Sequence, residues 1–255
     1  MNHNEIHAVM LAAGTGRRLS NGDYTLPPKC LLKFDGKSLL QRHIEALVDS
    51  KVKSLTIVVG FKSDLIMREI EDIRANEFVT FIDNNRFDRG SIVSLWCALE
   101  TLRSGYPILC MDADVLYHAS LIKILTTVST RSIVPYDREF EAGYEPVKLC
   151  LNSEKPVEFR KLVDCHYDRI GEWPGLMRLS PKSASLIAED LDKRMVSGNL
   201  DDPCEEAMRQ IILASEDNEF EFVDITGLPW IEIDFPEDAE MAKSTILPRI
   251  LAYSG

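Results

Sequence analysis

A buried strand that runs directly into a glycine loop opens the chain. Residues 7–19 read HAVMLAAGTGRRL, and residues 9–11 are apolar and partly branched, as suits a strand covered on both faces. Gly14 and Gly16 can adopt positive φ, so the loop can turn its backbone N–H groups into one concave space. The opening residues therefore predict an anion-binding loop at the end of a buried strand.

Segments of strand and helix character alternate after this loop. Apolar patterns predict strands at 6–12, 55–59, 78–82 and 107–111, and helices at 38–47, 65–73 and 91–102. This order predicts an α/β fold with a doubly wound, mainly parallel, Rossmann-like sheet. Ligands of such sheets bind at the carboxyl ends of the strands, where the glycine loop is expected to lie.

The second half is less regular, and we expect it to belong to the same domain. Residues 1–255 are interpreted as one domain, in which residues 1–116 bind a nucleotide and residues 117–255 bind an acceptor. Strands are predicted at 131–134, 147–151, 176–179, 220–225 and 230–234, and helices at 181–192, 204–214 and 236–253, the last closing the fold.

Basic side chains follow the glycine loop and suggest that its anion is a phosphate. Arg17 and Arg18 offer guanidinium groups that suit phosphate oxygens, and Lys29 follows two prolines that stiffen its approach. The pattern differs from a Walker A loop, and it lacks the third glycine of a dinucleotide-binding fingerprint. A nucleoside triphosphate is the expected ligand. An ordinary glycine turn with surface arginines is the alternative.

Two acidic pairs follow predicted strands. Asp112 and Asp114 end one strand, while Glu232 and Asp234 alternate with isoleucines in the sequence WIEID, so each pair shares one face. Mg²⁺ in proteins binds one or two carboxylates together with phosphate oxygens and water. The pairs predict a magnesium site, and strand-end turns or a solvated acidic face are the alternatives.

These motifs together resemble the nucleotidyltransferases that make nucleoside-diphosphate sugars and CMP- or CDP-activated alcohols. The sequence LAAGTGRRL followed by PPKCL resembles their signature, which places its arginine on Arg18 and its lysine on Lys29 as catalytic residues. The sequences DAD and WIEID resemble the metal motifs of the phosphocholine and phosphonate cytidylyltransferase branch, which places the metal ligands on Asp114 and Asp234. The resemblance implies a GT-A-like nucleotidyltransferase fold and Mg²⁺ as cofactor.

The same resemblance assigns the nucleoside-binding residues. A side-chain amide followed five residues later by a glycine and a hydroxyl residue matches Asn85, Gly90 and Ser91. Ser91 as the N-cap of the following helix is the alternative. The complete set expected to bind the nucleotide is Leu11, Ala12, Ala13, Gly14, Gly16, Asn85, Gly90, Ser91 and Asp112.

Charged residues of the second half are candidates for binding the acceptor. Lys148 lies in an apolar predicted strand, where a lysine needs a partner such as a phosphate, although it can also snorkel to solvent. Glu172 and Glu206 are candidates together with Lys148, because carboxylates near Trp173 would favour a cationic group. Glu205 is a further candidate for this pocket.

Composition excludes several other classes of protein. The net charge is −12, which argues against a nucleic-acid partner, since a broad basic surface is the usual footprint of such proteins. None of the six cysteines has C-x-x-C spacing, so we expect free thiols rather than disulfides or zinc. No segment reaches transmembrane length, so we expect a cytoplasmic protein that does not bind membranes.

The sequence thus predicts a magnesium-dependent nucleotidyltransferase that couples a nucleoside triphosphate to a small phosphorylated or phosphonate acceptor and releases pyrophosphate. The cytidylyltransferase motifs favour CTP. The first alternative is a sugar-1-phosphate nucleotidyltransferase that uses UTP, GTP or dTTP, and the second is a non-catalytic nucleotide-binding regulatory subunit. The sequence does not predict the oligomeric state.

Overall fold

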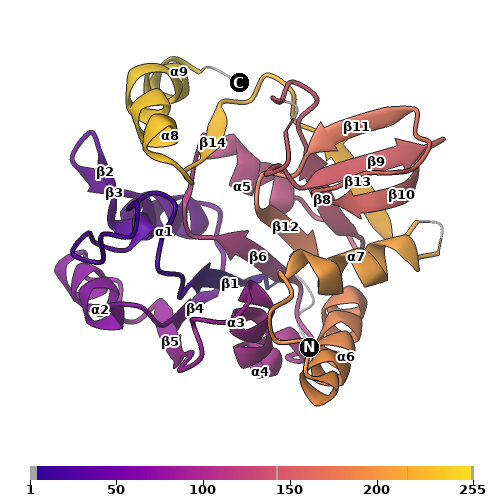
Figure 1. Cartoon of the computed structure of the whole chain (residues 1–255), viewed down its shortest axis with the longest axis horizontal. Coiled ribbons are helices and arrows are strands. Elements are labelled where there is room, and N and C mark those ends of the chain that lie inside the picture. The colour runs from indigo at the N-terminus through magenta and orange to yellow at the C-terminus, as the bar shows by residue number, and fades with distance from the viewer. Residues whose placement is uncertain (1–4, 142, 217, 254–255) are drawn as a thin grey trace.

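A seven-stranded sheet forms the centre of the computed structural model, which describes residues 5–141, 143–216 and 218–253 (Figure 1). The order of its strands is β13-β8-β12-β6-β1-β4-β5. Their bounds are β1 His7–Ala12, β4 Ser54–Val59, β5 Val79–Asp83, β6 Ile108–Asp112, β8 Ser132–Tyr136, β12 Leu176–Leu179 and β13 Phe220–Asp224.

Most neighbouring strands of this sheet are parallel. β1 pairs in parallel with β4 and β6, β4 with β5, and β13 with β8. β12 runs antiparallel to β6 and β8. The prediction of a mainly parallel α/β sheet is therefore confirmed, with one reversed strand that the sequence pattern did not indicate.

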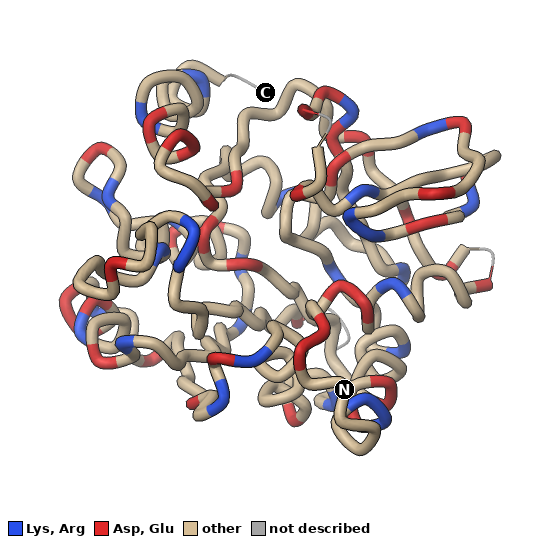
Figure 2. The backbone as a smooth tube through the Cα atoms, viewed as in Figure 1, with Lys and Arg blue, Asp and Glu red and all other residues tan. Residues whose placement is uncertain are grey.

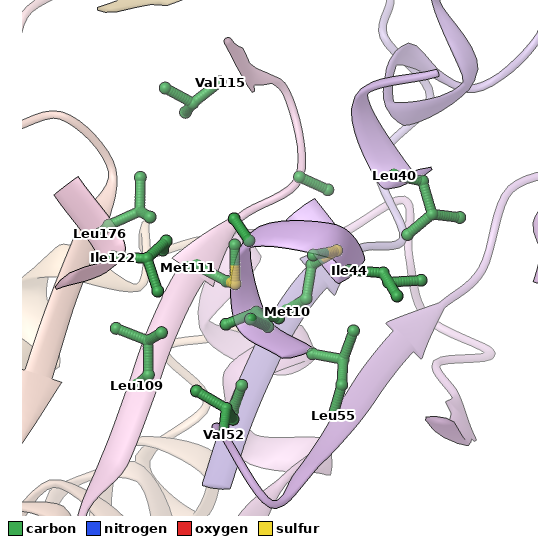
Figure 3. Close-up of a cluster of buried hydrophobic side chains, with 14 of the residues drawn as sticks. Met10, Leu40, Ile44, Val52, Leu55, Leu109, Met111, Val115, Ile122 and Leu176 are labelled. Atoms are coloured by element: carbon green, nitrogen blue, oxygen red, sulfur yellow. The ribbon is translucent and has the colours of Figure 1, made fainter. Parts of the chain in front are cut away.

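Helices cover both faces of the sheet because its strands are apolar on both faces. In β1, Ala8 and Met10 belong to one buried cluster and Val9 to the other. Figure 3 shows part of the first cluster, in which Leu40 and Ile44 of α1 and Ile122 of α5 surround Met10 and Met111. The first face is covered by α1 (Leu39–Asp49), α2 (Ser63–Asp72) and α5 (Ser120–Leu125), the second by α3 (Ser91–Cys97), α4 (Leu99–Leu102), α6 (Pro181–Ser197) and α7 (Glu205–Leu213).

Local signals explain where the longer helices begin and end. Ser38 caps α1 by accepting a hydrogen bond from the Gln41 N–H at 3.0 Å, and Ser180 caps α6 with Pro181 in its first turn. Gly198 ends α6 with φ of 79°. The predicted single helix at 91–102 was wrong, since Ala98 divides it into α3 and α4 by donating to the Leu95 carbonyl, three residues back.

A small sheet lies beside the central one. It contains β10 (Lys155–Arg160), β9 (Lys148–Asn152) and β11 (Arg169–Glu172), in that order, and α7 packs against β10. The sequence predicted only β9, because the other two strands read KPVEFR and RIGE and contain few apolar residues. This small sheet places segments of the second half beside the ends of the central strands.

The C-terminal segment returns to the middle of the chain. β14 (Trp230–Glu232) pairs with β7 (Val115–Tyr117), and α8 (Pro236–Met241), a π-helix (Ala242–Ile246) and α9 (Leu247–Ala252) follow it. The strand predicted to reach Asp234 therefore ends at Glu232, and the predicted closing helix contains a π-helical section. Ile233 and Ile246 pack against Phe34 of the hairpin that β2 (Lys33–Phe34) and β3 (Lys37–Ser38) form. The boundary predicted after residue 116 falls inside β7.

Charge is spread over the whole chain. Lys and Arg positions are interspersed with Asp and Glu positions along the backbone (Figure 2), so the net charge of −12 does not come from one acidic tail. Within the described residues, no helix is both long and apolar enough to cross a membrane.

Candidate active site

A cavity of about 440 Å³ lies at the carboxyl ends of β1 and β6. The glycine loop lines one part of it, with Arg17, Arg18 and the 3₁₀ turn that begins at Lys29 (Lys29–Leu31). Residues far along the chain, among them Glu145, Cys204 and Asp234, line the rest. The cavity thus brings together segments from the first and second halves of the chain at the place where parallel sheets bind ligands.

Lys29 and Arg18 form an ion-pair cluster with two aspartates. Lys29 Nζ lies 2.9 Å from Asp114 Oδ2 and 2.5 Å from Asp234 Oδ1, and Arg18 Nη2 lies 2.8 Å from Asp234 Oδ2. Arg18 also pairs with Glu145. Burial disfavours the charge of Lys29, but Asp114 and Asp234 outweigh burial and raise its pKa above the ordinary value. The four residues that the sequence assigned to catalysis and metal binding therefore lie in direct contact.

Three carboxylates of the cluster can hold a divalent cation. Asp114, Glu232 and Asp234 each offer an oxygen, and these oxygens lie within 4.8 Å of one another. Burial, followed by the charges of Asp114 and Asp234, raises the pKa of Glu232 well above its ordinary value. A cation would relieve this repulsion, so the donor set fits a metal such as Mg²⁺. The sequence analysis missed Glu232 as a ligand, although strand alternation had placed it on the face of Asp234.

Gly16 lets Lys29 reach the aspartates. It adopts φ of 62°, and a Cβ at this position would lie 3.2 Å from Cγ of Lys29. A larger residue would therefore press against the stem of the lysine and would also be strained in this conformation. Leu11, Ala12, Ala13 and Gly14 line the same cavity, as expected of residues that bind a nucleotide.

Asp112 lies in the cavity close against β12. Gly175 has φ of 78°, and a Cβ there would lie 2.9 Å from Oδ2 of Asp112, so the glycine leaves room for the carboxyl group. Burial, then the charges of Asp114 and Glu205, raises the pKa of Asp112 well above its ordinary value. A carboxyl group in this state can exchange hydrogen bonds with a ligand hydroxyl.

The residues predicted to bind the base do not all reach the cavity. Asn85 is exposed and does not line it, because its neighbour Asn84 occupies the inward position. Asn84 is buried, donates to Ser94 Oγ at 3.0 Å and accepts from the Arg86 N–H at 2.9 Å. The structure therefore does not support Asn85 as a residue of the cavity wall.

Gly90 and Ser91 hold a loop of the second half in place. A Cβ at Gly90 would lie 2.2 Å from the Asp202 carbonyl, so only glycine permits this approach. Ser91 lines the cavity and its Oγ accepts from the Cys204 N–H at 2.8 Å, while Gly90 itself is the N-cap of α3. The loop formed by residues 198–204 thus contributes Pro203 and Cys204 to the wall, which the sequence analysis had not foreseen.

Of the three predicted acceptor-binding residues, Lys148 and Glu172 are register partners in β9 and β11, whereas Glu206 lies on α7 and pairs with Arg160. Lys148 Nζ donates to the backbone carbonyls of Gly143, Pro146 and Lys161 at 2.8, 3.1 and 2.7 Å, which uses its three hydrogens inside the protein. Glu206 pairs with Arg160 at 2.7 Å and lines neither cavity. Glu172 lines a second cavity of about 440 Å³, beside the first. None of the three lines the first cavity, so their assignment to the acceptor stays a prediction that the first cavity does not support.

Other residues of the second half take their place in the first cavity. Its wall includes Val147, Lys161, Trp173 and Glu205. Glu205 therefore lines this cavity, whereas its predicted neighbour Glu206 does not. Helical geometry explains the difference, since adjacent residues on α7 face about 100° apart and only one of the two can face the cavity.

The six cysteines are free thiols. Four are buried, namely Cys30, Cys110, Cys150 and Cys204, and burial raises the pKa of each. Among the residues that the structure describes, the potential metal ligands that group together are carboxylates rather than thiolates.

Comparisons with known proteins relate the chain to nucleotidyltransferases. A family model described as the MobA-like NTP transferase domain matches residues 8–158. CTP:phosphoglutamine cytidylyltransferase of Campylobacter jejuni is 23% identical over 260 residues, which cover 92% of this chain and 98% of that protein. 2-Aminoethylphosphonate cytidylyltransferase of Lancefieldella rimae is 28% identical over 116 residues, 45% of each chain.

A solved structure extends the comparison to the whole fold. CTP:phosphocholine cytidylyltransferase from Streptococcus pneumoniae superimposes with a TM-score of 0.72, at 21% identity, over 94% of this chain and 98% of that chain. The prediction of a nucleotidyltransferase fold is thereby confirmed.

Proposed function

Because the chain belongs to the family of MobA-like NTP transferase domains and is a nucleotidyltransferase, we propose that it transfers a cytidylyl group from CTP to a small phosphorylated or phosphonate acceptor. The observation that supports this most directly is the cluster of Arg18, Lys29, Asp114 and Asp234 beside the glycine loop. CTP is favoured because the relatives described above carry CTP or cytidylyltransferase in their names.

The reaction is a substitution at phosphorus. An oxygen of the acceptor's phosphate or phosphonate forms a bond to the α-phosphorus of the nucleotide, and the bond between that phosphorus and the bridging oxygen breaks. The electron pair leaves with pyrophosphate. The protein contributes orientation and charge stabilisation, and no covalent intermediate with a side chain is required.

Each group of the cavity has a task in this proposal. The glycine loop holds the triphosphate through its backbone N–H groups, and Arg18 and Lys29 stabilise the negative charge that develops on the pyrophosphate. Asp114, Glu232 and Asp234 would hold a divalent cation, proposed to be Mg²⁺, which would neutralise phosphate charge. With both ligands bound, we expect Lys29 Nζ to exchange its aspartate partners for phosphate oxygens.

The test is pyrophosphate release measured with Mg²⁺, the four nucleoside triphosphates and a panel of acceptors. The panel contains phosphocholine, 2-aminoethylphosphonate, O-phosphoethanolamine and several sugar 1-phosphates. We expect release with CTP and at least one small phosphate or phosphonate. A preference for UTP, GTP or dTTP with a sugar 1-phosphate would replace the substrate assignment. Tight nucleotide binding without any release would indicate a regulatory subunit.

Two variants connect the activity to the cluster. Asp114→Asn and Lys29→Met should each lower kcat by about 100- to 1,000-fold, as expected when one group that stabilises transition-state charge is removed. The controls are Asp64→Asn and Lys37→Met, which change exposed ion-pair partners outside the cavity. Equal kcat values for the site variants and the controls would contradict the roles proposed for Asp114 and Lys29.

A further inference from the structure

His43 is a buried histidine beside the turn that carries Asp114. It belongs to α1, is only 1% exposed and lines neither cavity. Its Nε2 lies 3.2 Å from the carbonyl oxygen of Ala113, and its Nδ1 lies 2.8 Å from the hydroxyl oxygen of Tyr117. Both ring nitrogens of this core histidine therefore have a partner.

The two contacts fix which nitrogen of His43 carries the proton. A carbonyl oxygen can only accept, so Nε2 donates to Ala113, and the unprotonated Nδ1 accepts from the Tyr117 hydroxyl. Burial lowers the pKa of His43 to about 4, against the smaller opposing influence of the Ala113 carbonyl, so the ring is neutral at pH 7. Burial also raises the pKa of Tyr117, which therefore keeps its hydroxyl proton. The ring is thus a neutral donor with a defined orientation.

The carbonyl that His43 holds belongs to the peptide group between Ala113 and Asp114. The carbonyl on the other side of Asp114 accepts from the Ile233 N–H, at 3.0 Å. One of these hydrogen bonds comes from α1 and the other from the segment that follows β14. Because peptide groups are planar, holding both of them limits φ and ψ of Asp114 and thereby the direction of its side chain.

The direction of Asp114 decides whether the three carboxylates of the site form one set. Its carboxylate oxygen lies within 4.8 Å of those of Glu232 and Asp234. Mg²⁺ requires ligand oxygens at about 2.0–2.1 Å in a nearly octahedral arrangement, so a small displacement of one carboxylate weakens binding. Residues that hold a metal ligand from behind typically change metal affinity by about 10- to 100-fold when they are replaced.

On the basis of the proposed function, we infer that His43 is a positioning residue of the divalent-cation site, which acts through the peptide group between Ala113 and Asp114. Its hydrogen bond holds the Asp114 carboxylate together with the other two carboxylates of the site. Tyr117 keeps the ring in the tautomer that can donate. Through this bond α1, which supplies no residue to the wall of the first cavity, affects the affinity for the cation.

Two amide variants separate the two contacts of the ring. The side-chain amide of His43→Gln can take the position of Nε2 and donate to the Ala113 carbonyl. His43→Asn is shorter, so its amide reaches only the position of Nδ1 beside Tyr117. Both variants replace the buried ring by a neutral amide, so a loss caused by packing alone should appear in both.

The first measurement is the Kd of Mn²⁺, followed by electron paramagnetic resonance in the absence of nucleotide and acceptor. His43→Asn should raise this Kd by about 10- to 100-fold, whereas His43→Gln should stay within about threefold of the unmodified protein. The second measurement is pyrophosphate release as a function of Mg²⁺ concentration. His43→Asn should raise the Mg²⁺ concentration that gives the half-maximal rate by a similar factor, and His43→Gln should largely restore it.

His7→Asn is the matched control. His7 also contacts a hydroxyl group through Nδ1, that of Ser54 at 2.7 Å, but it lies at the start of β1, whereas the cavity lies at the end of that strand. This variant should keep the Mn²⁺ Kd of the unmodified protein. If His43→Asn fails to fold, as judged by its thermal transition, Tyr117→Phe removes only the hydroxyl that fixes the tautomer. It should raise the Mn²⁺ Kd in the same direction and by less.

Several results would overturn the inference. A folded His43→Asn protein with an unchanged Mn²⁺ Kd would do so, and so would an equal rise in His43→Asn and His43→Gln, since packing would then explain both. Where His43→Asn does not fold, an unchanged Kd in Tyr117→Phe is the contradicting result. Absence of Mn²⁺ binding by the unmodified protein would overturn the cation site together with this role.

Failure of the proposed function gives a different pattern. Pyrophosphate would then not be released with any nucleotide and acceptor, while the Mn²⁺ Kd would still rise in His43→Asn and stay low in His43→Gln. That pattern would reject nucleotidyl transfer and support the role of His43 in the cation site.

Discussion

The chemistry of individual residues here depends on which carboxylates have a basic partner. Asp114 and Asp234 share Lys29, and Asp234 also contacts Arg18. Within the part of the chain that the structure describes, other acidic side chains near the two cavities form no ion pair with Lys or Arg, and burial raises their pKa; these are Asp112, Glu172, Glu205 and Glu232. Carboxyl groups crowded together in this way destabilise the folded chain. Such destabilisation is typical of functional sites, and here it fits a site that binds cations and phosphorylated ligands.

Glu172 should make the stability of the protein depend on pH. Burial, followed by the charge of Asp137, raises its pKa from 4.5 to about 7. Between these values the folded state binds the proton more tightly than the unfolded state, so the free energy of unfolding falls as pH rises through this window. The glutamine side chain of Glu172→Gln stays neutral, so this variant does not lose free energy of unfolding as the pH rises. Its melting temperature relative to the unmodified protein should therefore increase from pH 5 to pH 8.

The measurement is thermal unfolding at both pH values without ligands. At pH 8 the free energy of unfolding of Glu172→Gln should exceed that of the unmodified protein by about 1–3 kcal/mol, the order of magnitude that a pKa shift of this kind implies. Glu77→Gln, which changes an exposed glutamate, is the control and should show no such trend. A constant difference between Glu172→Gln and the unmodified protein across this range would contradict the raised pKa.

At the scale of elements, one loop between helices completes the wall of the first cavity next to Ser91. Residues 198–204 join α6 to α7 and lie against the start of α3, where Gly90 donates to the Leu200 carbonyl at 2.9 Å. Arg89 and Asp201 add two hydrogen bonds, at 2.6 and 2.7 Å. The loop therefore connects the second half of the chain to Ser91 in the first half.

Gly90→Ala should separate this loop from α3. The added methyl group would meet the Asp202 carbonyl at 2.2 Å, so the loop or the helix must move. We expect a loss of about 1–3 kcal/mol in the free energy of unfolding, typical of overpacking, and a raised KM for the nucleotide. Gly143→Ala is the control, since its methyl group would meet only Pro146 at an ordinary 3.7 Å. Unchanged stability and nucleotide KM in Gly90→Ala would show that the loop does not form this wall.

At the scale of the whole molecule, strands from the two halves of the chain are interleaved. β12 lies between β8 and β6 in the central sheet, and β14 pairs with β7, so strands from both halves are neighbours. Met10 of the first half and Leu176 of the second belong to one buried cluster (Figure 3). The single-domain interpretation of residues 1–255 stays a prediction, which this arrangement supports.

Calorimetry can test that prediction. The full chain should unfold in one transition, with the calorimetric enthalpy equal to the van't Hoff enthalpy. A fragment of residues 1–116 should lack a cooperative transition, because the edge of β6 loses β12 and β7 is cut within its own bounds. Two transitions in the full chain, or a fragment that melts cooperatively, would show that the halves fold independently.

The sequence by itself determined the class of fold and indicated the residues that the structure brings together as an ion-pair cluster. Local apolar patterns predicted the parallel strands, since a strand covered on both faces must be apolar throughout. The glycine loop, Lys29, Asp114 and Asp234 could be assigned because strand ends and sequence motifs are local features. Weakly apolar strands such as β10 and β11, and the break at Ala98, could not, because long-range packing decides them.

Only the tertiary structure decided which side chains face the cavity. Asn85 is exposed because Asn84 bonds Ser94, and Lys148 is held by three carbonyls of neighbouring loops. Glu205 rather than Glu206 enters the wall because Arg160 holds Glu206 outside it. The partner of Glu206 is distant in the sequence, whereas Asn84 and Lys148 bond residues nearby in the chain, whose positions depend on how the loops fold. The spacing of residues does not predict either kind of contact, because both form only after the chain has folded.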